Sequence, residues 1–423
     1  MRAARRVLLR VVVATLALLR LSLAAENLPE FESLTEEEES AFEGPARLGP
    51  EYQANVLSYQ KPEAWEYEWL SHENALDLSI GSLDGSHFYM DQRLKLRARL
   101  GEWGEFRFTS LDDRDFEKQS IHPILEVIAW PDRRVGISLY GEADHFKRRD
   151  DTGVALLLRP QPRHEIRLFN TFVNVTLLKR NDRPDTFLEP DLPYSRGIVG
   201  RVHSDPAGRR GEFFEYAFRL DTRTRWYFPE EQYVYDYRKT FASLFFSRPI
   251  SPRVRLSSRL QFDRKQEARE PSSETSAIPA QDWTTDRFTG TLRTHLSEVG
   301  PDSDWGFGLG LGAALRLWRT EQGTARQRDL LPQLWLDLPG FASKAGLDRW
   351  SVGLSASFHH SEGPAALLAA GENRDSTELR FTLSYDFVFG ERAVLRLQAN
   401  GDLDEYGSPQ SWDGGNGQFI VTF

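Results

Sequence analysis

Apolar and polar residues alternate along most of the chain with a period of two. In residues 93–100, three leucines and an alanine fall on one face of an extended strand, and Arg93, Lys95, Arg97 and Arg99 fall on the other. A helix cannot sort residues in this way, because its period of 3.6 would spread both sets around the cylinder. The pattern therefore predicts β-strands.

The same alternation recurs in many later segments, including residues 135–140, 214–221, 254–263, 305–317 and 379–389. Several of these segments exceed ten residues, whereas strands of soluble proteins usually have five or six. A strand that crosses a bilayer at a tilt needs about 9–11 residues. We therefore expect an all-β fold, a transmembrane antiparallel up-and-down β-barrel; a soluble β-sandwich or propeller is the alternative.

Turn residues divide the strands. Short Gly- or Pro-containing turns are expected at 101–104, 131–133, 159–162, 249–252 and 390–391, and longer polar connections at 179–196, 268–282, 362–375 and 405–416. Short turns on one side and long loops on the other are typical of membrane barrels. Counting the alternating segments gives about 18 strands, with 16 as the alternative because residues 122–130 and 196–203 alternate weakly. The number should be even.

The N-terminal segment has the three parts of a secretory signal peptide. Arg2, Arg5, Arg6 and Arg10 make a positive start, an apolar stretch covers 11–19, and small residues allow cleavage after Ala24 or Ala25. Nine apolar residues are far fewer than the roughly 20 that a membrane-spanning helix needs. We expect three parts: a signal peptide at 1–25, an acidic periplasmic arm at 26–70 and an outer-membrane barrel at 71–423. A small plug is the alternative for the arm.

The composition agrees with a membrane β-barrel, which mean hydropathy does not reveal because only every second residue of each strand faces lipid. Mean hydropathy is −0.51, and we find no later apolar run long enough for a helical span. Aromatic residues make up 12% of the chain and include 11 tryptophans, as aromatic girdles at the two membrane interfaces would require. Cysteine is absent, which excludes disulfides, a lipid anchor on Cys and covalent haem attachment.

The chain ends on an alternating segment in which Phe419, Val421 and Phe423 share one face. With the signal peptide, the strands and the turns, this ending resembles bacterial outer-membrane β-barrel (porin-like) proteins, in which the insertion machinery reads the terminal strand and its final Phe. The resemblance covers roughly residues 71–423 and names no subfamily. It implies export to the outer membrane of a Gram-negative bacterium, with outer-membrane lipid and the barrel-insertion machinery as partners and Phe423 as the insertion signal.

If the apolar rows face lipid, the other rows line the lumen. The candidate lumen-lining residues are Arg93, Lys95, Arg97, Arg99, Arg219, Arg223, Arg253, Arg255, Arg259, Arg293, Arg316, Arg380 and Arg396. The same rows hold five more arginines, Arg107, Arg167, Arg225, Arg238 and Arg287. Their acidic residues are Glu105, Glu142, Asp144, Glu165, Glu215, Asp221, Asp236, Asp263, Asp337, Asp386 and Asp402.

Charge is segregated on this interpretation. Eighteen basic against 11 acidic side chains give the lumen about +7, whereas the whole chain carries −10. A wall rich in Arg concentrates anions, and Arg binds carboxylate, phosphate and sulfate groups bidentately. The other interpretation is structural, with Arg and carboxylates pairing across neighbouring strands. A bulge would shift the rows and change these assignments.

These observations predict a porin or channel that passes anionic solutes, with an acidic polysaccharide as an extended cargo. A scaffold that sheathes another protein, such as a multihaem cytochrome, is the alternative. An enzyme is not expected: Asp144-His145 and His359-His360-Ser361 are the only suggestive arrangements, and clustered His, Ser and Asp at the outer rim would favour a barrel enzyme. No cofactor, metal or nucleic acid is expected. The glycines at 306, 308, 310 and 312 form a bare inward strip, which either admits a loop, plug or solute or permits curvature.

Overall fold

The structure is a computed structural model. It describes residues 74–82, 88–101, 103–115, 118–142, 151–173, 187–190, 195–203, 212–228, 233–251, 254–271, 280–297, 306–340, 348–364, 367, 375–389, 393–404 and 412–422. The predicted signal peptide, the acidic arm and Phe423 lie outside these residues. Among the described residues, no helix is long and apolar enough to cross a membrane.

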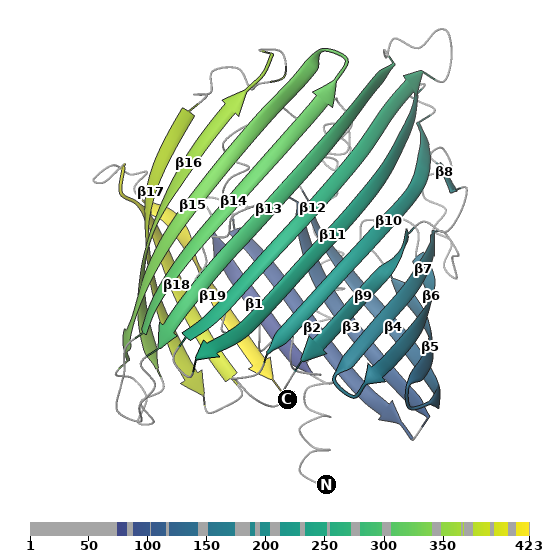
Figure 1. Cartoon of the computed structure of the whole chain (residues 1–423), viewed down its shortest axis with the longest axis horizontal. Helices are drawn as coiled ribbons and strands as arrows, with labels where there is room; N and C mark the ends of the chain where they lie inside the picture. The colour runs from purple at the N-terminus through teal and green to yellow at the C-terminus, as the bar shows by residue number, and fades with distance from the viewer. Residues whose placement is uncertain are drawn as a thin grey trace, which may run out of the picture. The chain divides into compact units, whose positions relative to one another are not determined.

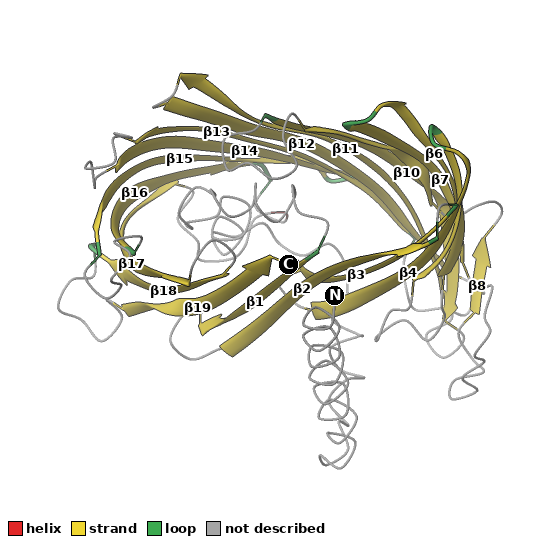
Figure 2. Ribbon diagram, turned by 90° about the horizontal axis from the view of Figure 1, so that it is seen from below, coloured by secondary structure: helices red, strands yellow, loops and turns green. Residues whose placement is uncertain are grey.

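All strands belong to one antiparallel sheet that closes on itself (Figures 1 and 2). The strands are β1 (Ala75–Ser82), β2 (Phe88–Leu100), β3 (Gly104–Asp115), β4 (Lys118–Asp132), β5 (Val135–Glu142), β6 (Asp151–Gln161), β7 (His164–Val173), β8 (Phe187–Pro190), β9 (Ser195–His203), β10 (Phe213–Phe228), β11 (Tyr233–Ser251), β12 (Val254–Pro271), β13 (Gln281–Ser297), β14 (Gly306–Thr320), β15 (Gly323–Pro339), β16 (Arg349–Glu362), β17 (Asp375–Phe389), β18 (Ala393–Asp402) and β19 (Trp412–Thr422).

Nineteen strand segments make an 18-stranded barrel because two segments share one position. The short β8 pairs with the far half of β10, at 224–227, and β9 pairs with its near half, at 213–221. The barrel closes where β1 pairs with β19, from Ala75 opposite Thr422 to Ser82 opposite Gly415. The predicted fold class is therefore confirmed, and 18 strands is the right number rather than 16.

The strands β4 and β9 lie where the alternation is weakest. In β4, Leu125 and Val127 point outward and are about half exposed, while Ile128 and Trp130 point inward and are buried. Both faces of β4 are thus apolar, since its inner face packs into a small core inside the barrel, formed by Ile128, Trp130, Tyr140, Ala155 and Leu157. The sequence of β4 therefore shows little alternation, because both of its rows are apolar.

The outward rows carry an apolar band that ends in ion pairs. On β15, Leu330, Leu334, Leu336 and Leu338 are 37–43% exposed, as lipid-facing side chains are in the isolated chain. Farther along the outward rows, toward the end away from Ala75 and Thr422, the band gives way to charged side chains. Asp286 binds Arg264 and Arg319 there, and Glu362 binds Arg326 and Arg328.

The five predicted short turns all lie at the end of the barrel that holds Ala75 and Thr422, between β2–β3, β4–β5, β6–β7, β11–β12 and β17–β18. The expected asymmetry is incomplete, however. Longer connections at 204–212, 298–305 and 340–348 lie at this same end, and at the opposite end Glu321 and Gln322 alone join β14 to β15. Strands β12 and β19 take up residues 268–271 and 412–416, which we assigned to loops.

Candidate channel interior

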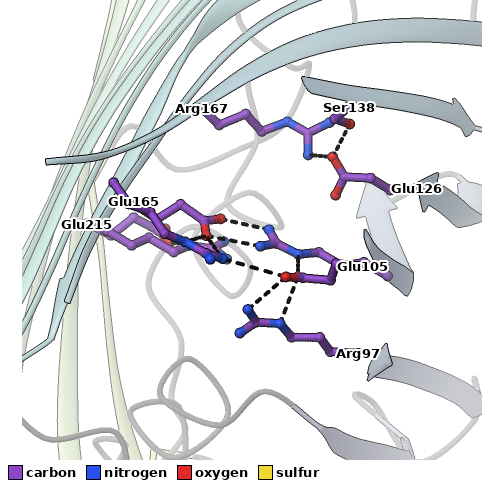
Figure 3. Close-up of polar contacts among 10 residues, drawn as sticks. Arg97, Glu105, Glu126, Ser138, Glu165, Arg167 and Glu215 are labelled. Carbon is purple, nitrogen blue, oxygen red and sulfur yellow. Dashed lines mark hydrogen bonds and ion pairs between the residues drawn. The ribbon is translucent and has the colours of Figure 1, made fainter. Parts of the chain in front are cut away.

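Inward-facing charged residues at the β2–β7 side of the barrel form a dense ion-pair network around Glu105 (Figure 3). Glu105 is 3% exposed and accepts hydrogen bonds from Arg97 Nη2 at 2.8 Å and from Arg107 Nε at 2.5 Å. Arg107 also donates two parallel hydrogen bonds to Glu165, at 2.7 and 3.0 Å. Arg159 binds Glu165 at 2.7 Å and lies 3.6 Å from Glu105. We call these five residues the Glu105 network.

The Glu105 network joins strands that are not neighbours. Arg107 is on β3 and Glu165 on β7, with three strands between them in the sheet. The pair therefore crosses the interior rather than running along the wall. Beside it, Arg167 of β7 reaches Glu126 of β4 at 2.5 Å in the same manner (Figure 3).

The small apolar core of β4–β6 fills the space beside this network. The guanidinium of Arg159 stacks 3.7 Å above the Trp130 ring, and that of Arg167 lies 4.5 Å from the Tyr140 ring. Tyr140 in turn covers Gly153 and shares a hydrogen bond with Thr171 at 2.7 Å. This side of the barrel is packed with side chains, so any open path must run along the remaining wall.

Strands β12–β14 form a wall with a strong excess of positive charge. Their inward rows carry seven cations against the two anions Asp263 and Glu267, a local balance of +5. The cations are Arg255, Arg259, Lys265, Arg269, Arg287, Arg293 and Arg316. Arg287 stands directly opposite Arg316 across β13 and β14 and forms an ion pair with Asp263 at 3.1 Å, and Lys265 forms one with Glu267 at 2.6 Å. We call this surface the β12–β14 basic wall.

The neighbouring strands β15–β18 have the opposite balance. Their inward rows carry Arg349, Arg380 and Arg396 against five carboxylates, Asp329, Asp337, Glu378, Asp386 and Asp402. Arg396 is buried and binds both oxygens of Asp386, at 2.7 and 3.0 Å. Positive charge is thus concentrated on one part of the interior rather than spread evenly around it.

Most of the 13 candidate lumen residues fall on inward rows with identifiable contacts. Arg219 lies 3.2 Å from Asp221, Arg255 donates to Ser247 at 2.8 Å, and Arg380 lies 3.3 Å from Glu378. Arg259 lies 5.0 Å from the Phe245 ring. Lys95 is half-buried on the row of Arg97, whereas Arg99 is exposed at the strand end. Arg293 is 7% exposed and Arg316 half-buried.

Three candidates are placed less fully. The backbone of Arg93 pairs with Asp77, which puts both on an inward row. Arg223 lies at a bulge between Asp221 and Thr224, and Arg253 falls outside the described residues. The register corrects our row assignment. Beyond the bulge, Arg225 of β10 pairs with Asp236 of β11 on the outward row, and Arg238 of β11 shares that row. Arg225, Asp236 and Arg238 therefore do not line the lumen.

The bare glycine strip on β14 is covered by a tryptophan at Gly310. A Cβ on Gly310 would lie 2.9 Å from the ring of Trp335, and one on Gly353 of β16 would lie 3.0 Å from it. Trp335 is 3% exposed. Gly310 and Gly353 therefore make room for the indole of Trp335 on the inner wall, which is neither of the two roles we expected.

The sequence pointed to His359-His360-Ser361 but not to the carboxylate that joins it on the inner wall of β15 and β16. His359 lies between Asp329, at 2.7 Å, and Ser361, at 2.5 Å. The spacing His359-x-Ser361 puts both of these side chains on one face of a strand. Asp329 could not be assigned from sequence, since its partner lies 30 residues away.

No protein-family model and no curated protein matches the sequence. Solved structures with a similar fold include a loop-deletion mutant of OmpT, an outer membrane protein of Vibrio cholerae (TM-score 0.40, 10% identity, 82% of this chain and 96% of that one). Others are OccK5 (OpdH) of Pseudomonas aeruginosa (0.38, 12%, 83% and 97%) and a bacterial polysaccharide outer membrane secretin (0.37, 8%, 84% and 99%). Similarity at this level does not identify a function, and the barrel architecture follows from this chain's own strand pairing.

Proposed function

We propose that the chain is an outer-membrane channel that passes anionic solutes along the β12–β14 basic wall. The observation that carries the proposal is the concentration of seven cations against two anions on the inner face of these three strands. A closed barrel with an apolar outward band belongs in a bilayer. Export through the predicted signal peptide would take it to the outer membrane.

Geometry favours a path along this wall rather than through the centre of the β2–β7 side. The Glu105 network and the small core occupy that side, and their charges are neutralised locally by short ion pairs. On the β12–β14 basic wall, cations outnumber carboxylates, and Arg287 stands opposite Arg316. Charged rings of this sign raise the local concentration of anions and exclude cations.

The wall is also suited to organic anions. Arg259 of the wall lies 5.0 Å from the ring of Phe245 on the neighbouring β11, and Arg219 of β10 lies 5.7 Å from the ring of Phe241, so guanidinium groups and aromatic rings lie together beside the wall. Guanidinium forks bind carboxylates bidentately, and aromatic rings contact apolar carbon. Small carboxylates are the cargo we propose, and an acidic polysaccharide would offer the same group repeatedly.

The test is the reversal potential of the purified protein in a planar bilayer under a potassium chloride gradient. We expect open channels with an anion-selective reversal potential. The double variant Arg259→Gln/Arg316→Gln should shift that potential toward the cation side, because it removes two of the seven cations. The matched control is Arg326→Gln, which removes an arginine from the outward face and should leave the potential unchanged.

Two results would contradict the proposal. A cation-selective channel would show that the charge of this wall does not set selectivity. A folded barrel without conductance would mean that the interior is filled, and a sheath around a partner protein would then become the better explanation.

A further inference from the structure

Three inward-facing side chains on β15 and β16 have the connectivity of a nucleophilic triad. Asp329 Oδ1 lies 2.7 Å from His359 Nδ1, and Ser361 Oγ lies 2.5 Å from His359 Nε2. His359 and Ser361 are two residues apart on β16, and Asp329 is the direct cross-strand partner of His359. All three are buried and fall on the inward rows of these two strands.

In the neutral imidazole, the two contacts select one tautomer. The Asp329 carboxylate is an acceptor, so His359 Nδ1 must carry the proton that it donates. Nε2 is then left with a lone pair in the neutral ring and accepts the hydrogen bond from the Ser361 hydroxyl. This is the arrangement in which a histidine removes the proton of a serine nucleophile while a carboxylate holds the ring in the required tautomer.

A further side chain holds Asp329. Gln327 stands opposite Ser361 in the register and donates from Nε2 to Asp329 Oδ2 at 3.3 Å. With one oxygen on the glutamine and the other on the imidazole, the carboxylate cannot rotate freely. Gln327, on the same strand as Asp329, therefore helps to orient the triad.

Two buried polar atoms beside the triad have no partner. Ser376, the β17 neighbour of His359, has a buried hydroxyl without a hydrogen bond, and so does the side-chain oxygen of Gln327. A buried polar group without a partner costs about 1–3 kcal/mol, so these atoms indicate a place for a polar ligand. The Ser376 hydroxyl is a donor that could face the oxygen of a substrate bound at Ser361.

We propose that Asp329, His359 and Ser361 form a hydrolytic site for small carboxylic esters on the inner wall of the channel. Ser361 Oγ forms a bond to the acyl carbon as its proton moves to His359 Nε2. Collapse of the tetrahedral adduct breaks the bond to the alcohol, which leaves with that proton. Water then hydrolyses the acyl–serine by the same route and releases the carboxylic acid.

The position of the site limits its substrates. Ser361 is 6% exposed, slightly more than His359 and Asp329 at 4% each, so only a small acyl group reaches its hydroxyl. Because the triad faces inward, the substrate is a solute in the lumen and not a lipid of the surrounding bilayer. The row of Ser361 and Gln327 continues to Arg316 on the β12–β14 basic wall, so an ester that carries a carboxylate would be drawn to this part of the wall.

A fluorophosphonate probe tests the proposal with the purified, folded full-length protein. The probe forms an Oγ–phosphorus bond and releases fluoride, and mass spectrometry then locates the modified serine. We expect modification of Ser361 approaching one label per barrel. Replacement of the general base in His359→Gln should slow labelling by about 10²–10⁴-fold. Hydrolysis of p-nitrophenyl acetate should fall in parallel.

Ser351→Ala is the matched control. Ser351 lies on the same strand and the same face and donates to Asp337 at 2.5 Å, but it has no histidine beside it. Labelling should persist in Ser351→Ala and vanish in Ser361→Ala, and conductance should be the same in both. An unlabelled wild-type barrel would overturn the proposal, as would equal labelling rates in wild type and His359→Gln. The three residues would then be a structural ladder.

Discussion

Glu105→Gln is the most direct test of how the packed side of the barrel is held together. Glu105 is 3% exposed and contacts three arginines of the Glu105 network. The glutamine amide carries no negative charge to neutralise these arginines, and its NH2 group would face their N–H donors. Removing one partner of a buried ion pair costs about 3–5 kcal/mol.

The structure places the expected loss near the lower limit. Arg107 also loses its contact with Glu105, but Arg107 and Arg159 both keep their hydrogen bonds to the carboxylate of Glu165, so the loss falls mainly on Arg97. The three arginine side chains are also 17–22% exposed, and water in the lumen would solvate them partly. We therefore expect the free energy of unfolding to fall by about 3 kcal/mol.

Glu215→Gln provides the comparison. Glu215 is also an inward-facing glutamate paired with an arginine, but its partner Arg201 is 47% exposed. Exposed pairs contribute about 0–1 kcal/mol. Urea unfolding in detergent, followed by the shift in gel migration between folded and unfolded barrel, would measure both variants. Equal losses in the two variants would refute the reasoning, because burial is the difference on which it depends.

Other substitutions test the packing of the inner wall. Gly153→Ala should cost about 1–3 kcal/mol, since its Cβ would lie 1.9 Å from the Tyr140 ring; Gly308→Ala, whose Cβ meets nothing closer than 3.6 Å, should be tolerated in the same unfolding assay. Trp335→Ala should cost about 3–5 kcal/mol and also raise single-channel conductance, because it removes an indole from the inner wall. Unchanged conductance in a folded Trp335→Ala barrel would mean that the path does not pass β14–β16.

The sequence predicts the class of fold well because alternation is a local property. Each strand with one lipid-facing row and one polar row shows the period of two by itself, and the strand number follows from counting. The alternation is hard to see in β4, because Ile128 and Trp130 stand on its inward row and pack in the interior core. The assignment of rows is wrong after the bulge near Arg223, because one inserted residue moves Arg225 to the other face of the sheet and the alternation of the sequence does not show it.

The interior is harder to predict because its contacts join distant strands. That arginines would dominate one face was visible in residues 253–263, but the distribution of carboxylates was not. Which arginines are neutralised depends on pairs such as Arg107 with Glu165, 58 residues apart. Two other contacts depend on the register between strands, which alternation alone does not give. They are the contact of Trp335 with Gly310 and that of Asp329 with His359.

The pairing of β1 with β19 has a consequence for the order in which the barrel is made. Gln418 donates to Asp77 across this seam, and the two residues are 341 positions apart. Every other strand can pair with a neighbour as soon as both have been synthesised, but the ring has two free edges until its final segment arrives. Unpaired edges invite pairing with other chains, so a chain truncated before residue 412 should aggregate rather than form a smaller ring.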